Sequence, residues 1–102
     1  MMILIFTTFH KKSEAVKIGK DLLKKRQIAC YNLMPVESAY LWKGKIVDDS
    51  ETLMILKTKQ VNFKMIESYI NKHSSNEVPE VVAIKASKVN GPYLNWINKE
   101  TK

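Results

Sequence analysis

Two long segments in the middle of the chain have the hydrophobic patterns of strands, Ile28–Trp42 and Lys45–Thr58, and only Lys43-Gly44 separates them. Glycine adopts positive φ without steric cost, so a two-residue step ending in glycine between two strand patterns predicts a tight β-hairpin. Each arm is longer than the usual strand of about five or six residues. We therefore expect the outer part of the hairpin to extend beyond its own domain and to pair with another subunit.

The second arm contains four consecutive apolar residues, Leu53-Met54-Ile55-Leu56. A strand with one solvated face alternates, whereas an unbroken apolar run is typical of a strand that is buried on both faces. The first arm contains Pro35, which has no backbone donor for a neighbouring strand. We expect a bulge, a kink or an edge position there.

The rest of the chain shows strand-like and helix-like periods in alternation. Apolar residues at i, i+3 and i+7 predict two amphipathic helices, and Ser13 followed by Glu14 is expected to cap the first of them. The chain breaks at Asn90-Gly91-Pro92 before a last short helix. The predicted elements are a first strand Met2–Thr8, helices Ser13–Arg26 and Gln60–His73, a short buried strand Val81–Ile84, and a C-terminal helix Tyr93–Glu100.

This order, β-α-β-β-α-β followed by a helix, predicts the α+β class and a ferredoxin-like sandwich. Two helices would cover one face of a four-stranded antiparallel sheet. The length of 102 residues indicates that residues 1–102 form a single domain. Because the ferredoxin-like fold serves many functions, it says little about activity.

Composition excludes several classes of protein. No apolar run approaches the roughly 18 residues that a membrane span requires, so we expect no membrane partner. Cys30 is the single cysteine, which rules out an internal disulfide framework and favours a cytoplasmic location. We interpret Cys30 as a small buried hydrophobic residue.

The net charge of +7 could attract nucleic acid, but the basic residues do not form one stripe along the sequence. Arg26 is the only arginine, and arginine makes most bidentate contacts to phosphate and guanine. The sequence also lacks the aromatic signature of an RNA-recognition module. We therefore expect no nucleic-acid partner.

Several short motifs occur in an order and spacing that match one family. The chain resembles the CutA family of divalent-cation tolerance proteins, and the resemblance extends from Ile3 to Asn98. The motifs that carry it are Ala29-Cys30-Tyr31-Asn32, Tyr40-x-Trp42-x-Gly44-Lys45, Glu51 before Leu56-Lys57-Thr58, Pro79-Glu80, and Tyr93-Leu94-x-Trp96.

This resemblance implies a homotrimer of ferredoxin-like subunits, assembled as in PII signalling proteins, with hairpins that pair between subunits. It also implies a role in the response to copper and other divalent cations, and no established enzymatic reaction. We further expect high thermal stability, because subunit association and surface ion pairs both stabilise the folded state when hot.

The expected metal chemistry is weak. The ligands proposed for the family are a cysteine at the end of the first strand and two adjacent histidines, and these match Thr7 and His73-Ser74 here. Only His73 remains, so we predict weak copper binding there and no required cofactor. The alternative is a solvated histidine that interacts with the helix dipole. Family members often have proline at the position of His10, and we expect a surface histidine.

Other candidates concern ligands and subunit contacts. Lys57 and Glu51 share one strand parity, and Lys57 next to an apolar run needs a charge partner or an anionic ligand. Together with Thr8 they are the candidate ligand-binding residues. A second interpretation of function is therefore a PII-like signalling module that binds a small anion between subunits. Large apolar side chains are the candidate trimer contacts, namely Tyr40, Trp42, Leu53, Ile55 and Trp96.

Overall fold

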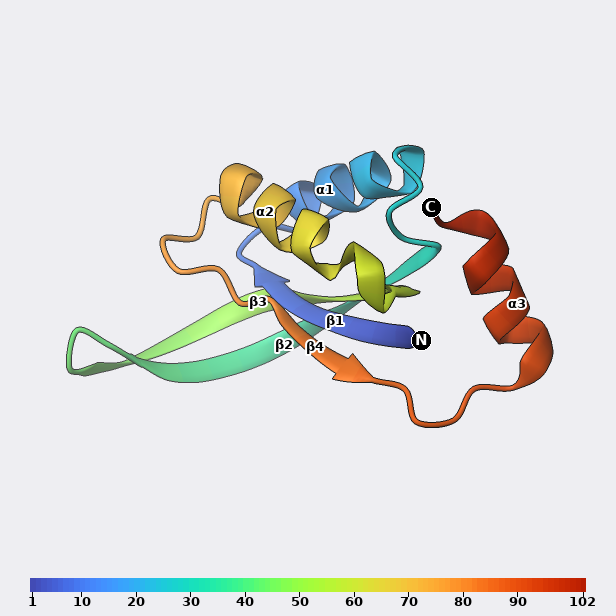
Figure 1. Cartoon of the computed structure of the whole chain (residues 1–102). Helices are drawn as coiled ribbons and strands as arrows, with labels where there is room; N and C mark the ends of the chain where they lie inside the picture. The colour runs from blue at the N-terminus through green and yellow to red at the C-terminus, as the bar shows by residue number, and fades with distance from the viewer.

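The computed structural model describes residues 1–102 and contains a four-stranded antiparallel sheet with two helices on one face and a third helix beyond one end (Figure 1). This confirms the predicted order of elements. The strands are β1 (Met2–Phe9), β2 (Cys30–Trp42), β3 (Lys45–Lys59) and β4 (Val82–Lys85); the helices are α1 (Lys12–Lys24), α2 (Phe63–His73) and α3 (Gly91–Glu100), with a 3-10 turn η1 (Gln60–Asn62) before α2.

The strands lie side by side in the order β2-β3-β1-β4. Helix α1 joins β1 to β2 and helix α2 joins β3 to β4, and in each case a third strand runs antiparallel between the two strands that the helix connects. This is the split β-α-β arrangement expected of a ferredoxin-like sandwich. None of the helices is long and apolar enough to cross a membrane.

The hairpin of β2 and β3 projects well past the helices (Figure 1). Its register is continuous from Cys30 opposite Lys57 to Trp42 opposite Lys45. Both turn residues have positive φ, 52° at Lys43 and 80° at Gly44, which is the geometry of a tight turn that follows the right-handed twist of the strands. Pro35 causes no bulge. It lies on β2, an edge strand, where a missing donor is tolerated.

The core lies between the sheet and helices α1 and α2. Alternate residues of β1 and β3 point toward the helices, and these are fully buried together with the apolar stripe of each helix. Each such side chain contributes about 1.5–3 kcal/mol through removal from water. The core consists chiefly of Ile3, Ile5, Phe9, Met54 and Leu56 from the strands and Ala15, Ile18, Leu22, Ile66 and Ile70 from the helices.

The other face of the sheet has no helix over it, and this corrects two expectations. The apolar run in β3 is buried on one face only, since Met54 and Leu56 are inaccessible but Leu53 and Ile55 are half-buried. Strand β4 is an exposed edge strand, with Val82 and Ile84 about half exposed. We call this surface the open face; it consists of Leu4, Phe6, Leu53, Ile55, Val82 and Ile84.

The ends of the helices also differ from expectation. Helix α1 begins at Lys12 and its N-cap is Lys11, so Ser13 lies within the first turn and makes no capping hydrogen bond. The helix ends at Lys24 because Arg26 adopts a left-handed conformation, with φ of 58°. Glu14 does lie in the first turn, as predicted.

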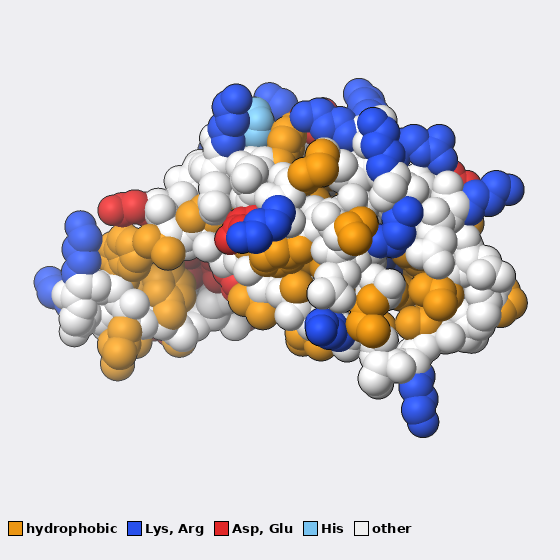
Figure 2. All heavy atoms as spheres, viewed as in Figure 1, with side chains coloured by type: hydrophobic (Ala, Val, Ile, Leu, Met, Phe, Trp, Pro, Cys, Tyr) orange, Lys and Arg blue, Asp and Glu red, His pale blue; other side chains and the backbone are white.

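Buried polar contacts attach the C-terminus to the end of the sheet away from the hairpin turn. The Asn62 amide donates to the carbonyl oxygens of Gln27 (3.2 Å) and Lys102 (3.3 Å) and to Thr58 Oγ1 (3.1 Å). The Lys102 amide donates to the Arg26 carbonyl at 2.8 Å. These contacts hold α3 against β3. Figure 2 shows lysine and arginine side chains gathered over α1 and α2, whereas apolar side chains cover the hairpin.

Candidate functional site

A cavity of about 480 Å³ lies where the base of the hairpin meets the end of β1 and the loop that follows α2. It contains Thr8 and Glu51, two of the three residues that the sequence predicted to bind a ligand. We call it the hairpin-base pocket. Its lining consists of Thr8, His10, Tyr40, Trp42, Val47, Glu51, Ser75, Asn76, Glu77, Val78 and Glu80.

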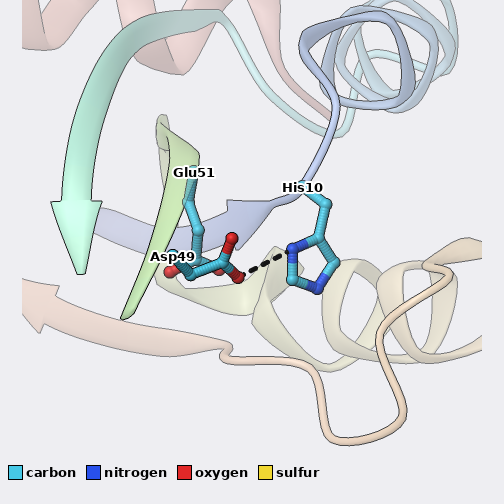
Figure 3. A group of neighbouring side chains, drawn as sticks. All are labelled: His10, Asp49 and Glu51. Atoms are coloured by element: carbon cyan, nitrogen blue, oxygen red, sulfur yellow. Dashed lines mark ion pairs between the residues drawn. The ribbon is translucent and has the colours of Figure 1, made fainter. Parts of the chain in front are cut away.

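Three potential metal ligands converge at this pocket, His10, Asp49 and Glu51, and one donor atom from each lies within 4.8 Å of the others (Figure 3). His10 Nδ1 is 3.0 Å from Asp49 Oδ2. The Tyr40 hydroxyl donates to the same carboxylate oxygen at 3.1 Å. His10 follows β1, whereas Asp49 and Glu51 project from one side of β3, so strand pairing brings the three together.

The pocket is acidic on a protein whose net charge is +7. Glu51, Glu77 and Glu80 line it, and no lysine or arginine does. The partial burial of the Glu80 carboxyl group, and then the charge of Glu51, raise the pKa of Glu80 above its usual value of 4.5. Glu51 is half-buried and makes no hydrogen bond or ion pair within the chain.

The loop that closes the pocket is held by side chains. The Asn76 amide donates to the Thr8 carbonyl at 2.9 Å, and Asn76 Oδ1 is buried without a partner. The Ser75 backbone amide and hydroxyl both donate to Glu14 Oε1, at 3.1 and 3.2 Å. The loop is thereby attached to β1 on one side and to α1 on the other.

Lys57 does not belong to this pocket. It is six residues from Glu51 along β3, a separation of about 20 Å in an extended strand. It lies on the sheet opposite Leu4 and Cys30, and its Nζ is 5.7 Å from the centre of the Tyr93 ring. No carboxylate pairs with it. The structure therefore separates Lys57 from the other two predicted ligand-binding residues.

His73 lies at the exposed C-terminal end of α2, on the helix side of the molecule. Its ring centre is 4.2 Å from that of Tyr69. The Tyr69 hydroxyl donates to Asp21 Oδ2 at 2.6 Å. Burial, followed by this hydrogen bond, raises the pKa of Tyr69 to about 12. His73 belongs to no group of three potential metal ligands.

The predicted subunit contacts remain partly exposed in the single chain. Tyr40 and Trp42, close to the hairpin turn, are each 37% exposed. Trp96 on α3 is 40% exposed, and its ring centre lies 5.5 Å from that of Tyr93. Leu53 and Ile55 belong to the open face. Cys30 is half-buried rather than fully buried, because it lies on the uncovered side of the edge strand β2.

Sequence reasoning missed the contribution of His10 and Asp49 to the candidate site. His10 was expected to be a surface residue, and it is, but its ring points to Asp49 (Figure 3). One signal was present in the sequence, since Asp49 and Glu51 are two residues apart and therefore share a face of the strand. The approach of His10 depends on the pairing of Phe9 with Thr52.

Comparisons with known proteins give a consistent result. Residues 3–100 match the family model described as CutA1 divalent ion tolerance protein. The chain is 38% identical over 98 residues to the divalent-cation tolerance protein CutA of Thermotoga maritima, covering 96% of this chain and 97% of that protein. It is 40% identical over 101 residues to the CutA protein of Pyrococcus horikoshii, covering 99% of each.

The structural comparison agrees. The solved structure of a protein named periplasmic divalent cation tolerance protein CutA, from Archaeoglobus fulgidus, matches with a TM-score of 0.98. The two chains are 31% identical, and the match covers 100% of each. The resemblance drawn from the short sequence motifs is confirmed by these matches.

Proposed function

The chain belongs to the CutA1 divalent ion tolerance protein family, which is non-enzymatic, and we propose that it acts as a homotrimeric divalent-cation tolerance protein. The trimer and the binding of metal are the parts that we propose. Both follow from the family and from features of this chain, which are argued in turn below.

The main support for the proposed trimer is the exposure of the apolar open face. Its six apolar side chains form one side of a sheet whose other side is already covered by helices. A contiguous apolar surface of this kind on a small domain is typical of a contact with another chain. Leu41 and Ile46, close to the hairpin turn, are also largely exposed. Copies of the same chain would cover both surfaces and would remove the exposed edges of the sheet.

Copper binding at His73 is proposed to be weak. A single imidazole offers copper(II) one ligand, and stronger sites need further ligands in a suitable geometry. His73 shares its surroundings with Tyr69, several lysines, Glu14 and Asp21. Both carboxylates already accept hydrogen bonds, Asp21 from Tyr69 and Glu14 from Ser75, and the lysines would repel a metal ion. This environment supports a low affinity and no required cofactor.

The alternative is a PII-like module that binds a small anion between subunits, and Lys57 is the observation that favours it. Lys57 is half-buried on the uncovered side of the sheet, and its ammonium group has no carboxylate partner. If another copy of the chain covers this side, the charge must meet an anion or a carboxylate of that copy. An ion pair with a neighbouring subunit is the competing interpretation.

The location that we propose is the cytoplasm, and it depends on the lone cysteine. The Archaeoglobus relative is named as a periplasmic protein, so the family is not restricted to one compartment.

Native mass spectrometry of protein purified without added metal tests the proposed function directly. The expected mass is three times the chain mass of 11.8 kDa, with substoichiometric copper or none. A monomeric species at micromolar concentration would contradict the trimer. A co-purified small anion, lost in Lys57→Met, would favour the alternative.

A further inference from the structure

We propose that His10, Asp49 and Glu51 form a binding site for a divalent cation of the zinc class at the base of the hairpin. The proposal adds a defined site to the proposed cation-related function and stands without it, because all three ligands come from one chain. The proposed zinc site is also separate from the expected copper site at His73, which lies on the helix side of the molecule.

The first argument is geometric. Ligands of a tetrahedral zinc ion lie about 2.0–2.2 Å from the metal, and two of them are therefore about 3.4 Å apart. The His10 nitrogen and the Asp49 oxygen are already 3.0 Å apart, and no two donors of the group are more than 4.8 Å apart. Small rotations of the half-buried Glu51 and the exposed His10 side chains would bring all three donors to one ion, with water in the remaining position.

The second argument is electrostatic. Glu51 is half-buried beside Asp49 and Glu80 and has no cationic partner in the chain. Partly buried carboxylates without a counter-charge are unfavourable, and a divalent cation would neutralise two of them together. Asn76, whose amide oxygen is buried without a partner, belongs to the same lining. No lysine or arginine of this chain lines the pocket to compete with a metal ion.

The third argument concerns rigidity. The Tyr40 hydroxyl holds Asp49 Oδ2 in place, which is the kind of outer contact that orients a ligating carboxylate. Asp49 and Glu51 are part of a strand that pairs with β2 at both positions, opposite Ser38 and Val36, and that also pairs with β1 from Thr52 onward. The backbone around Asp49 and Glu51 is thus fixed, and the adjustment is limited to the side chains of Glu51 and of His10, which lies in a short turn between β1 and α1. The site is therefore largely formed before any ion binds.

The ligand types indicate the class of ion. One imidazole and two carboxylates suit Zn²⁺, and the absence of any thiolate or thioether disfavours copper(I). Mg²⁺ and Ca²⁺ prefer oxygen ligands throughout, so the imidazole argues against them. The competing interpretation is a simple His10–Asp49 contact, with Glu51 paired to a lysine of a neighbouring subunit.

Calorimetric titration of metal-free protein with zinc chloride tests the site. We expect one zinc ion per chain. The affinity should fall about tenfold or more in His10→Ala and in Glu51→Gln, because even the loss of a group that only orients a ligand commonly costs that much. His73→Ala is the control for the other histidine and should change the affinity less than about twofold. Glu77→Gln removes the same charge from the pocket without removing a proposed ligand, and it should have a similarly small effect.

Nuclear magnetic resonance gives a readout that does not depend on affinity. The chain has only two histidines, so their imidazole signals are readily assigned with the two single variants. Zinc is expected to shift the His10 signals at stoichiometric amounts and to leave those of His73 unchanged. Retention of the native amide spectrum in each variant shows that the fold is intact.

Three results would overturn the proposal. The first is that the native protein binds no zinc, or that His10→Ala binds zinc as tightly as the native protein does. The second is an equal loss in Glu77→Gln and Glu51→Gln, which would indicate charge attraction without a defined site. The third is a shift of the His73 signals before those of His10. If the native protein proves to be a monomer, the proposed function is contradicted but the proposed zinc site is not, because all three ligands come from one chain.

Discussion

The two histidines show how the environment of a residue decides its chemistry. His10 directly follows strand β1, His73 is the last residue of helix α2, and both are exposed. His10 forms a group of converging donor atoms with two carboxylates. His73 lies against a tyrosine ring and near lysines, and it forms no such group with Glu14 and Asp21, the carboxylates of its own pocket. The His10 imidazole is thus placed to bind a cation together with Asp49 and Glu51, whereas the His73 imidazole is expected to bind one only weakly.

Copper binding at His73 can be isolated in a His10→Ala background. We expect the remaining affinity for Cu²⁺ to be weaker than about 1 μM, or roughly −8 kcal/mol, because one imidazole supplies a single ligand. Adding His73→Ala should abolish what remains, as measured by titration calorimetry. Submicromolar binding that disappears with His73 would mean that copies of this residue converge in the assembly.

The Tyr69–Asp21 hydrogen bond makes stability depend on pH at both extremes. The hydrogen bond from Tyr69, followed by smaller effects of nearby lysines, lowers the pKa of Asp21 below 3.8, so this contribution is present above that pH and is lost as the pH falls. The pKa of Tyr69 is raised from 10.0 to about 12, so its contribution is present below pH 10 and is lost as the pH rises toward 12.

Tyr69→Phe removes both effects at once. In metal-free protein, denaturant unfolding should show the native chain more stable than the variant near neutral pH, with the difference decreasing as the pH falls below 3.8 and as it rises toward about 12. A stability difference that is constant over the whole range would mean that the hydrogen bond does not couple the two groups.

At the scale of the element, the hairpin depends on its turn. The type of turn requires two residues with positive φ, and only the second of them is a glycine. Lys43 accepts this geometry at some cost, and Gly44 accepts it freely. The turn fixes the register of the strands, and with it the positions of Asp49 and Glu51 relative to His10.

Gly44→Ala is expected to destabilise the protein by about 1–2 kcal/mol, the cost of a left-handed conformation for a residue with a β-carbon. Gly91→Ala is the matched control, because Gly91 has ordinary φ and open space around its α-carbon, and it should have little effect. Thermal unfolding of the two variants measures the difference. Equal midpoints would show that the turn relaxes without strain.

At the scale of the whole molecule, three surfaces have different character. Lysine side chains gather over helices α1 and α2 (Figure 2), the open face is apolar, and the hairpin-base pocket is acidic. The net charge of +7 therefore does not describe any one of them. The apolar surface and the basic surface therefore lie on opposite sides of the sheet.

Trp42→Ala should weaken the trimer by about 2 kcal/mol or more per contact, since a buried tryptophan is commonly a dominant contributor to an interface. Lys20→Ala, on the helix layer, is the control and should leave the assembly unchanged. Light scattering over a range of concentrations measures both. Equal dissociation of the two variants would show that Trp42 does not contribute to the interface.

Thermal resistance is expected to exceed the ordinary range, with an unfolding midpoint above about 65 °C. Within the chain only two ion pairs form, His10–Asp49 and Arg26–Glu100, so surface ion-pair networks contribute little. Subunit association must therefore supply most of the effect, and the midpoint should rise with protein concentration. Calorimetry that finds a midpoint of about 45–65 °C, independent of concentration, would contradict this explanation.

The sequence by itself determined the elements, their order and the hairpin turn, because these follow from local periods and from the conformational freedom of Gly44. Motif order also identified the family. The sequence could not show that one side of β3 lacks a cover, since burial depends on which elements pack together. It misjudged the helix start at Ser13, where Lys11 takes the capping position without a side-chain bond. Only the tertiary structure brought His10 to Asp49 and Glu51 and separated Lys57 from them, because strand pairing, and not sequence distance, sets which side chains meet.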